Sequence, residues 1–496
     1  MGLQFIVLTD HGDGTRTPDP PQYRSGVLVI DGVELSTAGG HYIAIGLPRA
    51  PYPLRGEARD VVEDVRRLGG FGIVAHPDSA KEGLRWRDWE APFDAVEWLN
   101  ADTEWRDERV SHLARALLQY PFRSAETLAS LLDRPDPTLL RWDSITQRRR
   151  VVAVAGADAH ARAGWMDDDA IGYRRKWFLK FPSYEALFRT FATRIELTEP
   201  LQPDPFAASA QVTSALKSGH VFSAVTAIAA PAALQFSAEG ARGSRATQGD
   251  SLDSSGGSVS FVARSNVSAG GVIVLRQDGR IVAQHPLPEL KFTSSAGAGT
   301  YRVEVYLSHA PGDPPVPWIV SNPIYVRPPA WETANAVSLP PAAPVSSIQG
   351  GPWHVEKDAG STATFVQGNP PAGPLEFTYK LGNPASTERY VALGVSVGTA
   401  LTSNTRLAFR AQASQPMRLS VQARRPRSED RWQRSVYLDA TARDIFIPFS
   451  EMRAVAGGTT KFDPALADTV LFVVDLTNAL PGTAGSVTIS DLRVER

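Results

Sequence analysis

The stretch Phe5-Ile6-Val7-Leu8-Thr9-Asp10-His11 decides the fold, because a buried strand ends there at an acid and an imidazole. Four consecutive apolar residues cannot alternate between two faces. They predict an interior strand of a parallel sheet with helices on both sides. Folds of this kind place their chemistry at the carboxyl ends of strands, where loops vary on a rigid frame. His11 is therefore a candidate functional residue.

The same pattern, an apolar run with a metal-ligating residue type at one end, recurs downstream. The residues concerned are Glu34, His41, His76, Asp158 and His160. A single histidine beside a strand is more often a hydrogen-bonded core residue than a ligand. Four histidines and two carboxylates, all at strand ends, instead predict a metal site.

Composition limits the class of protein. A chain of 496 residues is too long for one core and predicts about three domains. With 51 basic and 53 acidic residues the formal charge is -2, which argues against a nucleic-acid partner. The chain has no cysteine, so disulfides, thiolate metal sites and a cysteine nucleophile are excluded. No apolar run approaches the roughly 20 residues of a membrane-spanning helix.

The predicted secondary-structure pattern changes twice along the chain. Up to residue 225, strand patterns alternate with helical patterns at 60–68, 109–119, 124–132, 138–147, 184–192 and 210–217. Residues 226–328 show short alternating strands with Gly and Ser turns, which is typical of a β-sandwich. The Pro- and Ala-rich segment 329–349 is predicted to be a linker. Residues 350–496 form a second all-β unit.

The candidate ligands point to a particular chemistry. Neutral imidazoles and carboxylates hold borderline divalent ions, which here means Zn, Mn or Fe, and a carboxylate can bridge two of them. Paired metals generate hydroxide near neutral pH and hold the attacking and leaving oxygens of an ester. Metal-dependent ester hydrolysis is the expected reaction.

These motifs resemble a known superfamily. Thr9-Asp10-His11, Gly32-Val33-Glu34, the His41 segment, His76-Pro77 and Asp158-Ala159-His160 are similar to successive motifs of the PHP superfamily, named for polymerase and histidinol phosphatase. The resemblance covers residues 1–225. The segment Ser321-Asn322-Pro323-Ile324-Tyr325 further resembles the tail of the carbaryl-hydrolase-like branch.

The resemblance implies a fold, a metal site and a reaction. It implies a distorted seven-stranded (β/α) barrel, followed in this multidomain chain by two all-β sandwich or jelly-roll units. It implies two or three Mn, Fe or Zn ions and a phosphoester, carboxylic ester or carbamic ester substrate. By analogy His11, His41, His76 and His160 are ligands, Glu34 is a bridging ligand, and Asp158 is a ligand that also orients the attacking hydroxide.

One departure from the family bears on activity. The family opens with a His-x-His motif on a first barrel strand, followed by a helix, and neither stands before Phe5. A start placed too far downstream is the first explanation, and genuine loss of the strand is the alternative. Losing these two ligands would weaken the binding of one metal ion most, while the remaining residues could still hold another, so the chain as given is expected to have reduced activity or none. If a signal peptide was lost with that strand the protein is exported; otherwise it is cytoplasmic.

Two weaker predictions concern binding. Arg16 and Arg49 follow loops of the expected site and could bind an anionic substrate through bidentate hydrogen bonds, although arginines at such positions are more often surface or loop residues. The C-terminal unit, with Trp353 and Trp432, resembles jelly-roll modules that bind carbohydrate. Tryptophans of a sandwich also commonly lie in its core.

A rival hypothesis from a different class stays open. The chain would then be non-catalytic, with a degenerate barrel that carries β-modules binding carbohydrate or a cell-surface partner.

Overall fold

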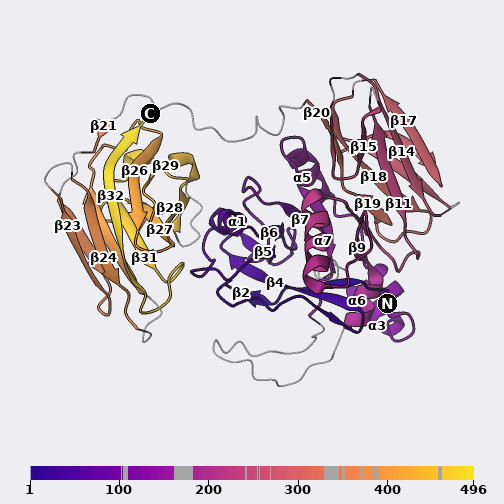
Figure 1. Ribbon diagram of the computed structural model, residues 1–496, viewed down its shortest axis with the longest axis horizontal. Helices are drawn as coiled ribbons and strands as arrows, with labels where there is room; N and C mark the ends of the chain where they lie inside the picture. Colours follow the sequence, from indigo (N-terminus) through magenta and orange to yellow (C-terminus); the bar gives the residue numbers. More distant parts are fainter. Residues whose placement is uncertain are drawn as a thin grey trace.

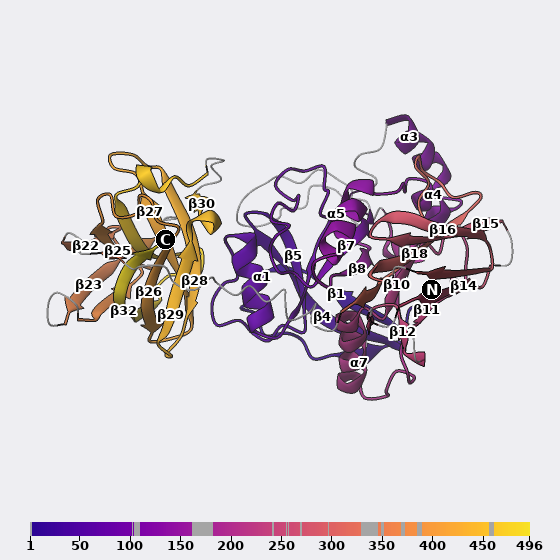
Figure 2. The same ribbon diagram turned by 90° about the horizontal axis from the view of Figure 1, so that it is seen from above.

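The computed structural model describes residues 2–496 apart from 102, 104–109, 161–181, 241–242, 254, 256, 268–269, 296, 329–345, 349–351, 369–372, 384–388 and 456–460. The described residues contain far more strand than helix and form three units (Figure 1). A first unit of strands and helices lies between two all-β units, as the view from above also shows (Figure 2).

The first unit is built on an eight-stranded sheet. Its strands run in the order β1-β4-β5-β6-β7-β8, and β2 and β3 also pair with β4. Their bounds are β1 (Phe5–Leu8), β2 (His11–Gly12), β3 (Gln22–Arg24), β4 (Val27–Thr37), β5 (Gly40–Ile45), β6 (Phe71–Val74), β7 (Ala95–Asn100) and β8 (Val152–Gly156).

The expectation of a seven-stranded (β/α) barrel is wrong. The sheet is mixed, because β4, β5 and β6 are antiparallel neighbours, whereas β1 is parallel to β4 and β6, β7 and β8 are parallel to one another. Only two residues, Ala38 and Gly39, join β4 to β5. Parallel neighbours need a crossover of a dozen or more residues, so this hairpin rules out the β/α repeat at that point. Among the described strands, β1 and β8 do not pair with each other.

The prediction that residues 5–8 form an interior strand of a parallel sheet is also wrong. Among the described strands β1 pairs only with β4 and is an edge of the sheet. Phe5, Ile6 and Val7 are only half-buried, and Leu8 is 45% exposed. The continuous apolar run reflects a strand that borders a pocket, described below, rather than one enclosed by helices.

Six helices lie among the described residues of the first unit and its border with the next. They are α1 (Ala58–Arg67), α3 (Val110–Gln119), α4 (Ser124–Ala129), α5 (Asp136–Thr146), α6 (Tyr184–Thr190) and α7 (Pro205–Ser218). Helix α1 buries Val61, Val62 and Val65 against the sheet, as its apolar periodicity predicts. It ends where Gly69 takes a positive φ of 85°. No described helix is long and apolar enough to cross a membrane.

The second unit is a β-sandwich. One sheet has the order β13-β20-β18-β19-β10-β9 with β15 and β16 attached, and the other has the order β12-β11-β14-β17. The two sheets enclose a core that includes Phe236, Phe261 and Tyr301. The strands are β9 (Ala192–Ile195), β10 (Val221–Ala224), β11 (Leu234–Glu239), β12 (Arg245–Thr247), β13 (Ser251–Asp253), β14 (Val259–Ser265), β15 (Gly271–Gln277), β16 (Arg280–Pro286), β17 (Glu289–Ser294), β18 (Gly299–Leu307), β19 (Ile319–Ser321) and β20 (Ile324–Arg327).

The second unit is tied closely to the first. Strands β9 and β10, which precede residue 226, belong to its larger sheet. The side chain of Asn322 accepts a hydrogen bond from the Ala153 N–H over 2.8 Å and donates one to the Ala153 carbonyl over 2.9 Å. Strand β8 is therefore held in place by the sandwich beside it.

The C-terminal unit is a second β-sandwich. Its sheets have the orders β23-β24-β32-β26-β29, with β21 on β32, and β22-β25-β31-β27-β28-β30. Phe377, Phe409 and Phe472 lie in the core between them. The strands are β21 (Ser346–Ser347), β22 (Trp353–Lys357), β23 (Thr362–Gln367), β24 (Leu375–Lys380), β25 (Tyr390–Ser396), β26 (Arg406–Ala413), β27 (Met417–Arg424), β28 (Arg431–Leu438), β29 (Arg443–Pro448), β30 (Arg453–Ala454), β31 (Thr469–Asp475) and β32 (Ala484–Glu495). The predicted linker at 329–349 lies outside the described residues except for 346–348.

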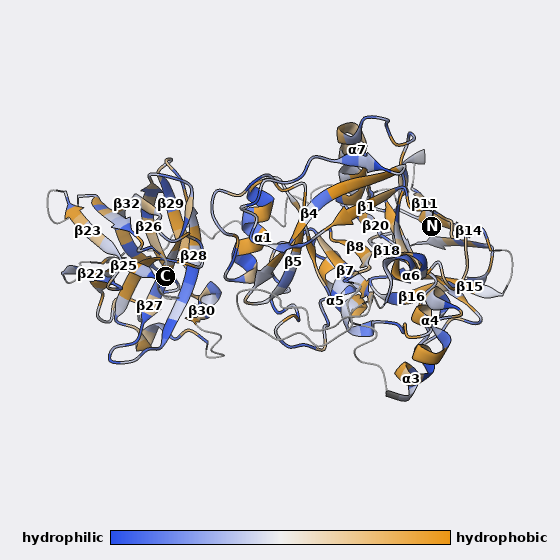
Figure 3. Cartoon of the chain, turned by 90° about the horizontal axis from the view of Figure 1, so that it is seen from below, coloured by the Kyte–Doolittle hydropathy of each residue, from blue (hydrophilic) through white to orange (hydrophobic). Residues whose placement is uncertain are grey.

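The C-terminal unit docks on helix α1 through charged side chains. Arg418 of β27 is buried, and its Nε donates to Asp64 over 2.8 Å. Arg434 of β28 forms ion pairs with Asp60 and Glu63 of the same helix. Figure 3 shows hydrophilic segments on both α1 and β28, which face each other. The outer face of this sheet is thus an interface within the chain.

Candidate metal centre

Strand register brings the first three predicted ligands together. His11 of β2 lies opposite Glu34 of β4 in a parallel pair. Glu34 in turn lies opposite Ile43 of β5. His41 is two residues from Ile43 and therefore projects from the same face of the sheet as Glu34.

The Glu34 carboxylate lies between three imidazoles. Its Oε1 is 2.6 Å from Nδ1 of His41 and 3.1 Å from Nε2 of His76. Its Oε2 is 3.9 Å from Nδ1 of His11. The ring centroids of His41 lie 5.3 Å from His11 and 5.0 Å from His76. Residues from three separate segments thus converge on one buried carboxylate.

The remaining two predicted ligands follow β8 and reach the same place. Nδ1 of His160 lies 3.2 Å from Oδ1 of Asp158, and the His160 ring centroid is 6.2 Å from that of His11. His76 and Asp158 both have positive φ values, 31° and 42°. Non-glycine residues rarely adopt this region, and such strain concentrates at functional sites.

A carboxylate that the sequence reasoning missed lies directly behind this group. Glu97 of β7 is buried, and its Oε2 accepts hydrogen bonds from the His76 main-chain N–H (2.8 Å) and from Nδ2 of Asn100 (2.7 Å). Glu97 therefore holds the strained backbone of His76. The signal was present in the sequence, because a lone acid interrupts the apolar run Ala95-Val96-Glu97-Trp98-Leu99.

Space for this carboxylate depends on one glycine. A Cβ atom at Gly156 of the neighbouring strand β8 would overlap the Glu97 carboxylate. The absent side chain lets Glu97 lie between β7 and β8.

The charges of the site shift the protonation of its members. Burial alone would raise the pKa of Glu34, but hydrogen bonds from His41 and His76 outweigh it and hold the pKa well below its usual range. Burial alone would lower the pKa of His76, but the carboxylates of Glu34, Glu97 and Asp158 raise it to about 9. Burial and the nearby Asp158 raise the pKa of Glu97 to about 7.

The donor set fits a divalent cation. One ligand atom from each of His11, Glu34 and His41 can be chosen so that all lie within 4.8 Å of one another. Nδ1 of His76 is buried and has no hydrogen-bond partner among the described residues. A buried ring nitrogen without a partner is costly, but it is Nε2 that faces Glu34, so Nδ1 points away from the group formed by His11, Glu34 and His41. Imidazole and carboxylate ligands without sulfur suit Zn, Mn or Fe.

The two arginines predicted to bind substrate do not join this group. Arg16 forms an ion pair with Asp31, with Nη2 2.6 Å from Oδ2. Arg49 is exposed, and neither arginine lines the pocket that contains all the candidate ligands except His41.

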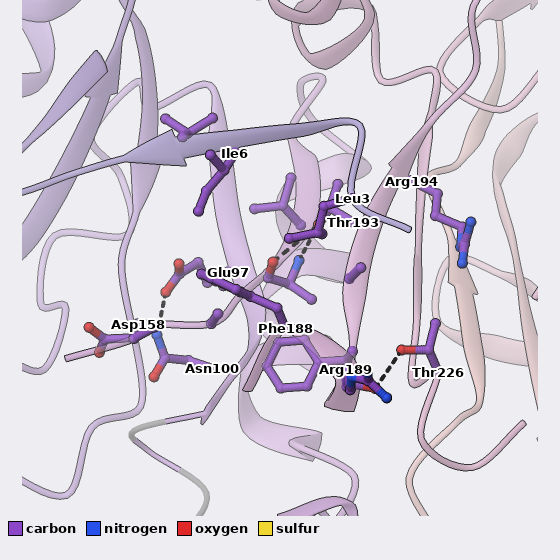
Figure 4. Close-up of a pocket in the computed structure, with 18 of the residues that line it drawn as sticks. Leu3, Ile6, Glu97, Asn100, Asp158, Phe188, Arg189, Thr193, Arg194 and Thr226 are labelled. Carbon is purple, nitrogen blue, oxygen red and sulfur yellow. Dashed lines mark hydrogen bonds between the residues drawn. The ribbon is translucent and has the colours of Figure 1, made fainter. Parts of the chain in front are cut away.

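That pocket has a volume of about 1470 Å³ and extends well beyond the candidate ligands. Figure 4 shows Asp158 and Asn100 on one side and Arg194 on the other, with Phe188 and Thr193 between them. The metal centre is thus one end of a larger, partly apolar space.

The tryptophans predicted as a possible sugar platform are mainly core residues. Trp432 is 3% exposed and packs on Phe462, with ring centroids 5.4 Å apart. Trp353 is half-buried and stacks on Phe472, with centroids 6.1 Å apart.

Comparison with known proteins identifies no family. No protein-family model matches the chain, and no curated protein sequence matches it. A solved structure of a family 11 carbohydrate-binding module from Clostridium thermocellum, in complex with a β-1,3-1,4-mixed-linked tetrasaccharide, is 14% identical. That alignment covers 30% of this chain and 93% of the module, with a TM-score of 0.24. A point mutant of a family 29 carbohydrate-binding module is 11% identical, with 31% of this chain and 91% of the module covered and a TM-score of 0.21.

Proposed function

We propose that this chain is a metal-dependent hydrolase of carboxylic, carbamic or phosphoric esters, related to the carbaryl-hydrolase-like branch of the PHP superfamily. The observation that carries the proposal is the convergence of His11, His41 and His76 on the buried Glu34 carboxylate. The ligand atoms of His11, Glu34 and His41 support it, because they can all lie within 4.8 Å of one another.

Each residue has a role in this proposal. His11, Glu34, His41, His76, Asp158 and His160 would hold one or more divalent ions. Such an ion supplies a Lewis acid that polarises the ester and lowers the pKa of water. Asp158 would orient the attacking water and accept its proton, since its carboxylate lines the pocket beside the other ligands. Glu97 would position His76 through the hydrogen bond to its main chain.

Metal content tests the site directly. Full-length protein loaded with Mn, Fe or Zn and then dialysed should retain the metal, measured by inductively coupled plasma mass spectrometry. Glu34→Gln and His76→Ala should lose most of it. Glu90→Gln is the matched control, because Glu90 is an exposed carboxylate paired with Arg148 and lies outside the pocket.

Hydrolysis tests the reaction. Loaded protein should cleave 4-nitrophenyl acetate or bis(4-nitrophenyl) phosphate, and chelation should abolish the rate. A chain that binds no metal, or that cleaves both esters equally well after chelation, would contradict the proposal.

A carbohydrate-binding role for the C-terminal unit is the second candidate. It is favoured by a partly exposed polar row on β22 and β27. Nε2 of His354 lies 2.9 Å from Glu356, whose two oxygens each accept a hydrogen bond of 2.8 Å from Arg424. Fixed planar donors and acceptors of this kind suit sugar hydroxyl groups.

Affinity electrophoresis of the full chain tests this second role. Soluble mixed-linked glucan, xyloglucan or glucomannan in the gel should retard the protein, and Glu356→Ala should abolish the retardation. Glu376→Ala changes an exposed glutamate of the opposite sheet and should leave it unchanged. Equal migration with and without every polysaccharide would exclude the role for these glycans.

A further inference from the structure

Three arginines line the pocket, and two of them, Arg123 and Arg194, form no ion pair with another described residue. Arg194 is the less exposed of the two. Arg194 of β9 lines the pocket, and its Nε is buried without a hydrogen-bond partner. In the part of the chain that the structure describes, its guanidinium forms no ion pair either. Arg189 lines the same pocket but is paired with Glu185 over 2.9 Å. Partly burying a cation without a counter-ion is costly, so Arg194 is a candidate for binding an anion in the pocket.

Arg194 lies within reach of a ligand that also touches the metal centre. The hydroxyl of Thr193, the preceding residue, accepts a hydrogen bond from the Ala155 N–H and donates one to the Ala155 carbonyl, over 3.0 and 3.1 Å. Asp158 is three residues beyond Ala155, which extended chain spans in about 10 Å. Arg194 and Asp158 line the same pocket and lie on opposite sides of it in Figure 4.

Several apolar side chains line the space between the two ends. Leu3 and Ile6 of the N-terminal segment line it on one side, and Phe188, Phe191 and Phe222 line it elsewhere. Leu3, Ile6 and Phe188 are only half-buried in the described structure. A ligand with an apolar chain would cover these side chains, and their removal from water would favour its binding.

We propose that Arg194 is a specificity-determining residue that binds the anionic end of an elongated substrate. The substrate class is an ester with an apolar chain that ends in a carboxylate or phosphate. Its ester group lies at the candidate metal centre, and its anion receives a bidentate pair from the Arg194 guanidinium. Placing the ester at the metal rests on the proposed function, whereas the charge preference of the pocket does not.

A binding experiment tests the charge preference without requiring catalysis. The probe is 11-(dansylamino)undecanoic acid, with its methyl ester as the neutral counterpart, and binding to the full-length protein is followed by dansyl fluorescence. We expect the acid to bind about tenfold or more tightly than the ester, which corresponds to one charge-assisted pair. Arg194→Met should remove this preference, and Arg194→Lys should restore part of it. Arg189→Met is the matched control and should keep it. The affinity of the corresponding phosphonic acid, compared with that of the carboxylic acid, shows which of the two anionic groups the pocket prefers.

Hydrolysis by the same variants separates the two proposals. The 4-nitrophenyl monoester of sebacic acid should show a lower KM than its methyl-capped diester in the wild type, and Arg194→Met should equalise the two. Loss of the charge preference in Arg194→Met without any hydrolysis would support this inference and contradict the hydrolase. An unchanged ratio of acid to ester binding in Arg194→Met, or no binding of either probe by the wild type, would overturn the inference.

Discussion

The main-chain N–H of His76 donates a hydrogen bond of 2.8 Å to Oε2 of Glu97, a residue 21 positions further along the chain. This bond connects the loop after β6 to the interior of β7. It holds His76 at its positive φ and so aims the imidazole at Glu34. A buried acid that was not predicted as a ligand thus determines how the His76 imidazole is presented to Glu34.

Replacing Glu97 by alanine should therefore destabilise the protein and weaken metal binding together. The His76 N–H and the Asn100 amide would lose their acceptor in a buried site, at about 1–3 kcal/mol for each group. Glu97→Gln keeps one acceptor oxygen and should cost less. Chemical denaturation gives the stability, and metal titration of the folded variant gives the affinity. A Glu97→Ala protein that matches the wild type in both would show that His76 needs no such support.

Gly156→Ala, on the neighbouring strand β8, should likewise lower the stability of the protein and weaken metal binding. The added methyl group would overlap the Glu97 carboxylate, which would have to move away from its hydrogen-bond donors on His76 and Asn100. Overpacking of this kind costs about 1–3 kcal/mol. Gly83→Ala is the control, because a Cβ there meets nothing within 4 Å. Equal melting temperatures for the two variants would contradict the close packing described here.

The metal-free protein should lose stability as the solution becomes alkaline. The pKa of His76 is raised from about 6.5 to about 9 in the folded chain. The contribution of protonated His76 to the free energy of unfolding is then fully present below pH 6.5. It is lost as the pH rises through about 9. The lowered pKa of Glu34 gives the opposite pH dependence. The contribution of ionised Glu34 to the free energy of unfolding is lost as the pH falls below about 4.5.

Thermal unfolding of chelator-treated protein between pH 6.5 and 9 measures this effect. Glu34→Gln removes the hydrogen-bonded carboxylate that raises the pKa of His76, so its melting temperature should fall less over the same interval. Parallel curves for the two proteins would show that the pair does not titrate in this way.

The positions of the candidate ligands could be predicted from the sequence, whereas the direction of the strands could not. An apolar run that stops at His11 or His76 marks a strand end whatever the neighbouring strand does. Parallel or antiparallel pairing depends instead on the connections. The two-residue loop at Ala38 and Gly39 was the available signal for a hairpin, and it contradicts the barrel.

Burial was harder to predict than strand position. The run at residues 5–8 would suit a strand enclosed on both faces, yet β1 is an edge strand beside the pocket. Apolar periodicity measures the tendency of a strand to be buried and does not say what covers it. Glu97 was missed for the converse reason. A single acid in an apolar run changes the periodicity little, but its burial requires partners that only the folded chain reveals.

The final prediction concerns the contact between α1 and the C-terminal unit. Arg418 is buried and pairs with Asp64 over 2.8 Å, with Asp60 over 3.2 Å and with Glu63 over 3.3 Å. Arg418→Met would leave Asp60 and Asp64 as buried carboxylates with one cation fewer, and breaking a buried pair in this way costs about 3–5 kcal/mol. Arg410→Met is the control, because Arg410 is exposed and its 3.5 Å pair with Asp444 should contribute at most about 1 kcal/mol.

Differential scanning calorimetry of the full chain is the measurement. Arg418→Met should unfold at a lower temperature or show a separate earlier transition, since the two units would no longer stabilise each other. Adding Asp64→Asn to Arg418→Met removes one of the unpaired charges and should recover part of the loss. If Arg418→Met and Arg410→Met unfold alike, the charged contact does not hold the units together, and the outer face of the sheet formed by β27 and β28 would be available to a ligand.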